Sequence, residues 1–153
     1  MNNILIYTFF SYTKKSSKEL YLLENKNIDK LFIPNTFSTN KLLSLVPKYR
    51  YVIGIADNRK NAKESRFDTK YINRYGKREL VNNSSEYLYS NLDIVLPDTF
   101  YTYDNTTNGP CNRSAYLVMD RIVNEKLDTK FGFFHINKNR VKDAIGEILE
   151  NLI

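Results

Sequence analysis

The sequence predicts a layered α/β fold in which helices cover a largely parallel sheet. Three apolar runs, at residues 4–9, 51–55 and 131–136, are continuous rather than alternating, which is typical of strands buried on both faces. Segments with helical spacing of apolar residues alternate with these runs. At 153 residues with 42% hydrophobic side chains, the chain can bury such a core as one domain spanning residues 1–153.

The first half of the chain is expected to alternate strands and helices. A seryl hydroxyl can cap a helix start, and prolines 34 and 47 end the elements before them. In order, the expected elements are a strand at 4–9, a helix from Ser16 or Ser17 to about Leu23, a strand at 31–33, a helix at 40–46 and a strand at 51–55.

The second half begins with a polar segment at 57–70 that is expected to be a loop, and residues 73–90 show little periodicity. Residues 93–96 are expected to form a strand that ends at Pro97. Asn108, Gly109 and Pro110 mark a turn directly before Cys111. A helix then follows with apolar residues at helical spacing, namely Ala115, Val118, Met119, Ile122 and Val123. The last expected elements are the strand at 131–136 and a helix at 141–152.

The composition argues against several classes of protein. The net charge of +6 would suit an acidic partner, but no run of five basic residues occurs, so no nucleic-acid partner is expected. No apolar stretch approaches membrane-spanning length, and the first residues lack the pattern of a signal peptide. A single cysteine cannot form an internal disulfide, which favours a cytoplasmic protein. One Cys and one His are too few for a zinc site, so neither metal nor cofactor is expected.

Cys111 and His135 are the only cysteine and the only histidine, and they are candidates for a nucleophile and its base. Cys111 stands at the start of a helix, where free N–H groups and the helix dipole are expected to lower the thiol pKa. His135 stands near the end of a buried strand. Ligands of open α/β sheets bind at the carboxyl ends of strands, so the two residues are expected to meet there.

A catalytic imidazole also needs a third group that orients it, and Asp68 and Glu64 in the polar segment are both candidates. Spacing alone does not choose between them. The developing oxyanion needs a donor, which backbone N–H groups at the Cys111 helix start or an arginine could supply. A lone cysteine or histidine is more often structural, so the argument depends on the pair occurring together.

These segments together resemble the pyroglutamyl peptidase I (pyrrolidone carboxyl peptidase) family of cysteine peptidases. The run at 4–13 is similar to the first strand and substrate loop of the family, and Phe9 and Tyr12 fall on the two aromatic positions that hold the pyroglutamyl ring. Residues 51–55 match the third strand, whose last residue, Ile55, the resemblance also places at the substrate.

The more specific part of the resemblance concerns the catalytic positions. Asp68 and Arg78 match the family's catalytic Glu and the Arg that helps to bind the oxyanion. Cys111, followed by an Asn, and His135 match the catalytic pair, and their separation of 24 residues is that of the family. The resemblance therefore implies a set of four catalytic residues, which are Cys111, His135, Asp68 and Arg78.

The resemblance implies a three-layer α/β/α sandwich with a mostly parallel mixed sheet. It implies a cysteine-type exopeptidase that removes an amino-terminal pyroglutamyl residue through an acyl-enzyme, with a peptide or small amide as substrate. It also allows a homo-oligomer. The alternative is a catalytically inactive or differently specific relative that acts as a binding or scaffold protein, because fold does not fix function.

Overall fold

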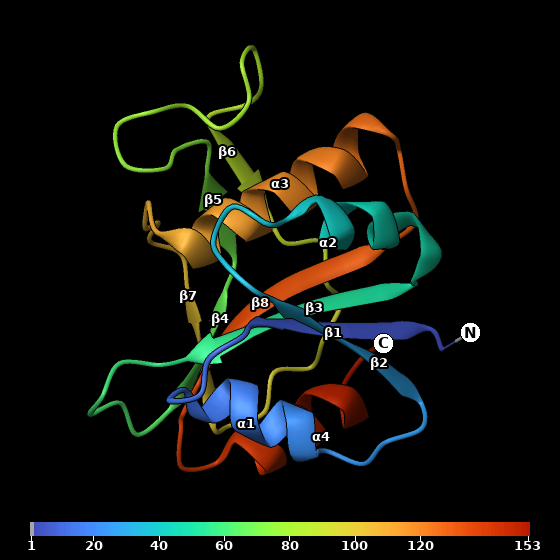
Figure 1. Ribbon diagram of the computed structural model, residues 1–153, viewed down its shortest axis with the longest axis vertical. Coiled ribbons are helices and arrows are strands. Elements are labelled where there is room, and N and C mark those ends of the chain that lie inside the picture. The colour runs from blue at the N-terminus through green and yellow to red at the C-terminus, as the bar shows by residue number, and fades with distance from the viewer. Residues whose placement is uncertain (1) are drawn as a thin grey trace.

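The computed structural model describes residues 2–153. A six-stranded sheet in the order β2-β1-β3-β8-β4-β7 runs through the middle of the molecule, with helices on both faces (Figure 1). The strands are β1 (Ile4–Phe9), β2 (Ile28–Ile33), β3 (Tyr51–Asp57), β4 (Ser65–Asp68), β7 (Phe100–Tyr103) and β8 (Lys130–Ile136). A separate antiparallel pair consists of β5 (Lys70–Ile72) and β6 (Tyr87–Tyr89).

Strands β2, β1, β3 and β8 are mutually parallel, whereas β4 runs antiparallel to β8 and β7 runs parallel to β4. The sheet is therefore mixed and mostly parallel, as predicted. The helices are α1 (Lys15–Leu22), α2 (Asn40–Leu45), α3 (Pro110–Asn124) and α4 (Val141–Glu150), with a short 3₁₀ turn at Val46–Lys48. None of the helices within residues 2–153 is both long enough and apolar enough to span a membrane.

The sheet separates two hydrophobic cores, because successive side chains of a strand point to opposite faces. Ile53, Ile55 and Phe134 pack with residues of α1 and α4 on one face. Tyr7 and Phe133 pack with residues of α2 and α3 on the other. Figure 1 shows α1 and α4 below the sheet and α2 and α3 above it, which confirms the three-layer architecture.

Several local predictions are wrong. The expected loop at 57–70 contains β4, and β7 was not predicted. Residues 93–96 do not form a strand, and only an isolated bridge joins Ile94 to Leu152. No serine caps α1. The carboxylate of Asp57, at the end of β3, instead accepts hydrogen bonds from the backbone N–H groups of Lys15 and Ser16, at 3.0 and 2.7 Å.

Candidate active site

Cys111 occupies the first turn of α3, and the surrounding sequence explains why the helix begins there. Pro110 is the first helical residue, where a proline loses no helical hydrogen bond and its φ suits the helix. Asn112 anchors this turn to β5: its side-chain oxygen accepts the N–H of Ile72 at 2.8 Å, and its amide donates to the Ile72 carbonyl at 2.9 Å. The thiol is therefore held at a rigid helix start.

His135 faces α3 because it is two residues after Phe133 on β8 and shares its side of the sheet. Close packing of β3 against its neighbours β1 and β8 holds the Phe133 and His135 side of β8 in place. A Cβ at Gly54 would come within 2.3 Å of the Phe133 ring and 2.8 Å of the Tyr7 ring, so only glycine fits there. The two aromatic rings pack with centroids 6.0 Å apart beneath the candidate site.

His135 lies beside an ion pair formed within β4. Asp68 Oδ2 is 2.9 Å from His135 Nδ1, and Asp68 Oδ1 is 2.8 Å from Nε of Arg66. The Arg66 guanidinium also lies 3.3 Å from His135 Nδ1. Side-chain exposure is only 14 to 15% for all three residues, so water screens these charges weakly. A proton on Nδ1 that is donated to Asp68 leaves Nε2 free to act as a base.

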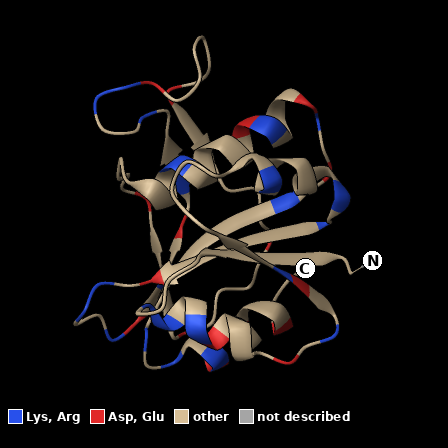
Figure 2. Ribbon diagram, in the orientation of Figure 1, with Lys and Arg blue, Asp and Glu red and all other residues tan. Residues whose placement is uncertain are grey.

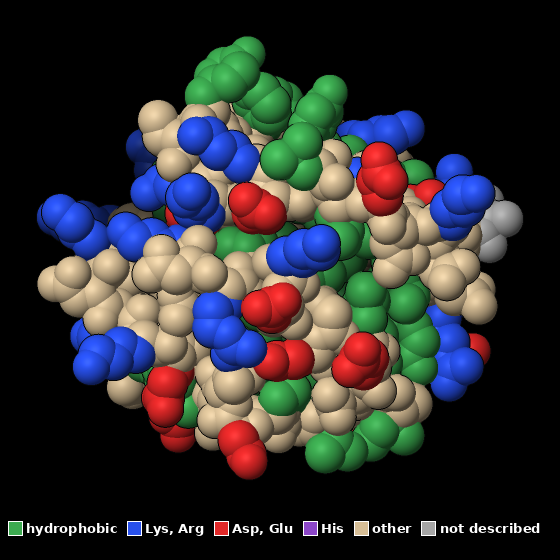
Figure 3. All heavy atoms as spheres, turned by 90° about the horizontal axis from the view of Figure 1, so that it is seen from below, with side chains coloured by type: hydrophobic (Ala, Val, Ile, Leu, Met, Phe, Trp, Pro, Cys, Tyr) green, Lys and Arg blue, Asp and Glu red, His purple; other side chains and the backbone are tan. Residues whose placement is uncertain are grey.

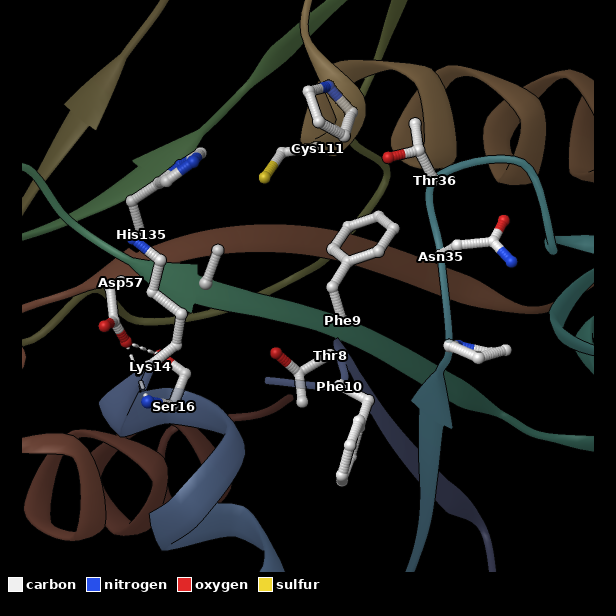
Figure 4. A pocket seen from close by; sticks show the side chains of 13 residues that line it. Thr8, Phe9, Phe10, Lys14, Ser16, Asn35, Thr36, Asp57, Cys111 and His135 are labelled. Carbon is white, nitrogen blue, oxygen red and sulfur yellow. Dashed lines mark hydrogen bonds between the residues drawn. The ribbon is translucent and has the colours of Figure 1, made fainter. Parts of the chain in front are cut away.

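Cys111 and His135 line one pocket of about 370 Å³ at the carboxyl ends of β1, β3 and β8. Figure 4 shows the Cys111 sulfur and the His135 ring directed into the same space, from α3 and β8 respectively. The ring of Phe9 points into this space as well. Phe10 also lines the pocket, although its ring extends away from the sulfur and the imidazole. The remaining lining residues are Thr8, Lys14, Ser16, Pro34, Asn35, Thr36, Ala56, Asp57 and Pro110.

Burial raises the pKa of the Cys111 thiol to about 12, and the nearby Asp68 carboxylate adds to that effect. The positive charges of Arg66 and Lys14 oppose it. The expectation of a lowered thiol pKa is therefore wrong for the protein at rest, because loss of water around the sulfur outweighs the favourable helix start. A neutral thiol can attack a carbonyl only if its proton is transferred as the new bond forms.

The structure brings only one of the three expected substrate-binding residues to this pocket. Phe9 lines it. Tyr12 does not: its side chain is 81% exposed and packs edge-to-face on Phe10. Ile55 does not line it either, because its side chain is buried on the α1–α4 face, and its neighbour Ala56 takes that place. The carbonyl of Ile55 accepts the hydroxyl of Thr8 at 2.8 Å.

Two further expected residues lie outside the pocket. Glu64 is exposed, so Asp68 is the carboxylate beside His135. Arg78 is also exposed, on a turn whose backbone pairs with Tyr75. That turn contacts the loop before α3, since the backbone N–H of Gly76 donates to the Asn108 carbonyl at 3.2 Å. Arg78 therefore lies on a turn that is hydrogen-bonded to the loop before Cys111, but Arg78 does not line the pocket.

Arg66 is a site residue that the sequence reasoning missed. The available signal was the alternation in residues 65–68, where buried Ser65 and Phe67 alternate with Arg66 and Asp68. This pattern is typical of a strand with one polar face. Among residues 2–153, no group of three or more His, Cys, Asp and Glu side chains is placed to hold a metal ion.

Neither a protein-family profile nor a curated protein sequence matches the chain. Solved structures do. Pyroglutamyl peptidase I of Bacillus amyloliquefaciens matches with a TM-score of 0.81 at 12% identity, over 99% of this chain and 97% of that one. The pyrrolidone carboxyl peptidase of Thermus thermophilus matches with 0.76 at 14% identity, over 97% and 100%. That of Thermococcus litoralis matches with 0.72 at 13% identity, over 90% and 77%.

These matches span nearly the whole chain, with little identity of sequence, and they coincide with the layer order and mixed sheet described above. The protein thus has the fold of pyroglutamyl peptidase I and is a divergent example of it.

Proposed function

We propose that the protein is a cysteine-type exopeptidase that removes an amino-terminal pyroglutamyl residue from peptides. The observation that carries the proposal is the placement of Cys111 and His135 on one pocket, with Asp68 Oδ2 2.9 Å from His135 Nδ1. This is the arrangement in which a base activates a thiol and a carboxylate orients the base. The shared fold adds support, although fold alone does not fix an activity.

In the proposed reaction, Cys111 Sγ attacks the scissile carbonyl carbon while its proton passes to Nε2 of His135. The tetrahedral intermediate collapses, the C–N bond breaks, and His135 gives that proton to the leaving amine. Water then attacks the thioester with His135 as base, which releases pyroglutamate and restores the thiol. Asp68 stabilises the imidazolium that forms in each half of the reaction.

The oxyanion is expected to be stabilised at the start of α3. The first N–H groups of a helix have no carbonyl partner within the helix, and that of Cys111 is adjacent to the attacking sulfur. The resemblance assigns Arg78 to the same task. A hydrogen bond joins its turn to the loop before Cys111, so this assignment belongs to the same proposal.

The pocket suits a small, mostly apolar acyl group. Phe9 and Pro34 provide apolar walls, and Asn35 and Thr36 provide groups that can pair with a lactam. The ring would therefore lie against Phe9, with its carbonyl directed toward Cys111 (Figure 4). A cytoplasmic location belongs to the same proposal, because a reducing compartment keeps the thiol available.

The test is release of a chromophore from a pyroglutamyl arylamide by the wild-type protein, Cys111→Ala and His135→Ala. Turnover that is lost in both variants, with their far-UV circular dichroism unchanged, is the expected result. The matched control is Ser44→Ala at an exposed position of α2. Turnover that persists in Cys111→Ala would contradict the proposal, because any residual hydrolysis would then arise elsewhere.

One observation favours a second candidate, a binding or scaffold protein without activity. The raised pKa of Cys111, whose side chain is half-buried, is that of an unreactive thiol. This candidate predicts no arylamide turnover, together with tight binding of pyroglutamyl peptides that does not depend on the thiol. Wild-type protein that binds a pyroglutamyl peptide in calorimetry but does not cleave it would therefore distinguish this candidate from the enzyme.

A further inference from the structure

We propose that a second, basic pocket next to the candidate active site binds a carboxylate carried by the leaving peptide, so that acidic peptides are the preferred substrates. This inference rests on the proposed function and adds a substrate class to it. The pocket has a volume of about 570 Å³ and is lined by Arg59, Ala62, Lys63, Glu64, Arg66, Tyr101 and Tyr103. It lies over the amino-terminal part of β4 and the neighbouring strand β7.

Arg66 is paired with Asp68, but the other two cations of this pocket have no acidic partner within hydrogen-bonding reach in the described part of the chain. Arg59 and Lys63 take part in none of the ion pairs found among residues 2–153, and Glu64 is the one acidic residue among those that line the pocket. Figure 2 shows basic residues on the loop between β3 and β4, at the lower left. Seen from below, Lys and Arg side chains gather at the left margin, on the side of that loop (Figure 3).

Arg66 joins the second pocket to the candidate active site. On one side its guanidinium contacts Asp68 and His135, and on the other it lies over the ring of Tyr103 at 4.0 Å. These contacts fix the planar group between the two pockets. A guanidinium held over an aromatic ring presents its remaining N–H donors edge-on, which is the geometry that a carboxylate accepts.

The order of strands indicates which part of a substrate would reach this pocket. In the proposed reaction the acyl group lies toward β1, at Phe9, and His135 on β8 protonates the leaving amine. Strands β4 and β7 follow β8 in the sheet, so Arg66 lies beyond His135 from the acyl pocket. A peptide that leaves past His135 would therefore carry its first residues over β4 and β7, into the basic pocket.

The experiment compares kcat/KM for amidated pyroglutamyl peptides of equal length whose first leaving residue is Glu or its neutral counterpart Gln. A third substrate, the Gln peptide with a free terminal carboxylate, distinguishes a side-chain carboxylate from a chain end. If Arg59 and Lys63 each contribute as much as a surface ion pair, kcat/KM for the Glu peptide should be about fivefold higher than for the Gln peptide. The double variant Arg59→Gln/Lys63→Gln should abolish that advantage and leave arylamide turnover unchanged.

The matched control, Lys41→Gln/Lys48→Gln, removes the same charge from exposed positions that line neither pocket and should keep the preference for Glu. Equal kcat/KM for charged and neutral peptides, or a preference that survives Arg59→Gln/Lys63→Gln, would overturn the proposal. Failure of the peptidase itself is separable, because the same peptides can be titrated into Cys111→Ala by calorimetry. Tighter binding of the Glu peptide would then support the basic pocket, and equal affinities would overturn it.

Discussion

The hydroxyl of Tyr7 on β1 lies 2.9 Å from the hydroxyl of Ser114 on α3, and both side chains are fully buried. Ser114 donates in turn to the carbonyl of Cys111 at 3.0 Å, so Tyr7 is the donor to Ser114. This chain of hydrogen bonds connects the central sheet to the turn that carries the thiol. A buried polar pair of this kind stabilises one geometry, because any displacement leaves hydroxyl groups without partners.

Replacing Tyr7 with Phe should destabilise the protein while leaving the fold intact. The substitution leaves the buried oxygen of Ser114 without its donor, which should lower the free energy of unfolding by about 1 to 2 kcal/mol. Urea unfolding followed by circular dichroism measures this change. Tyr12→Phe is the control: that side chain is 81% exposed, so its unfolding midpoint should not move. Equal midpoints for Tyr7→Phe and the wild type would contradict the role of the buried pair.

Alkylation of the lone cysteine should report its raised pKa directly, because the thiolate is the reactive form and no other thiol contributes. The folded-state pKa of about 12 predicts an iodoacetamide rate that climbs with pH from 7 to 10 without a plateau.

The raised pKa of Cys111 also makes the stability of the fold depend on pH. An unfolded thiol releases its proton near its ordinary value of 9.0, so the Cys111 contribution to stability is present below that pH and is lost as pH rises toward 12.

The negative charge of Asp68 contributes to that raised value, so Asp68→Asn should increase the alkylation rate at pH 8. A plateau below pH 8 in the wild-type protein would instead mean that the thiolate is already formed at rest. That outcome would contradict the description of Cys111 as a thiol that is neutral at rest.

Asp68→Asn should lower kcat for arylamide hydrolysis by about 100-fold or more, because an amide cannot stabilise the imidazolium or hold the same tautomer. Glu64→Gln is the matched change at the other carboxylate in this region. Glu64 is exposed and makes no ion pair among residues 2–153, so its variant should keep wild-type kcat. The reverse result, with activity lost only in Glu64→Gln, would require the loop and β4 to rearrange in the working enzyme.

Arg78→Gln tests the residue that the resemblance assigns to the oxyanion. If the turn at Arg78 closes on the substrate, kcat should fall by about 100-fold with KM little changed, as for loss of an oxyanion donor. Lys77→Gln, at the neighbouring exposed position, should leave both constants unchanged. Unchanged kinetics in Arg78→Gln would assign oxyanion binding to the N–H of Cys111 alone.

Much of the layered fold could be predicted because the apolar pattern of its central strands and helices is visible within each segment. The apolar run at residues 4–9 coincides with β1 (Ile4–Phe9), and the run at 131–136 lies within β8 (Lys130–Ile136). A strand covered by helices on both faces must be apolar throughout, so the pattern is local and strong. The same holds for the apolar stripe of α4, whose residues Ala144, Ile145 and Ile148 are buried as expected.

The outer strands could not be predicted in this way. β4 and β7 have four residues each, and β4 pairs antiparallel with β8 and parallel with β7. Short strands of this kind are stabilised by hydrogen bonds to strands distant in the chain rather than by their own composition. Because β4 is not predicted, Arg66 is not identified as a site residue, although it contacts Asp68 and His135.

The sequence by itself determined the α/β class, the central strands, the helix that begins near Cys111, the helix that begins at Val141, and the pairing of Cys111 with His135 as candidates. Only the tertiary structure decided which carboxylate lies beside the imidazole, which aromatic residue lines the pocket and in which direction the thiol pKa moves. The reason is physical. Residue type and periodicity are local properties, whereas burial, charge proximity and the reach of a side chain depend on which distant strands become neighbours.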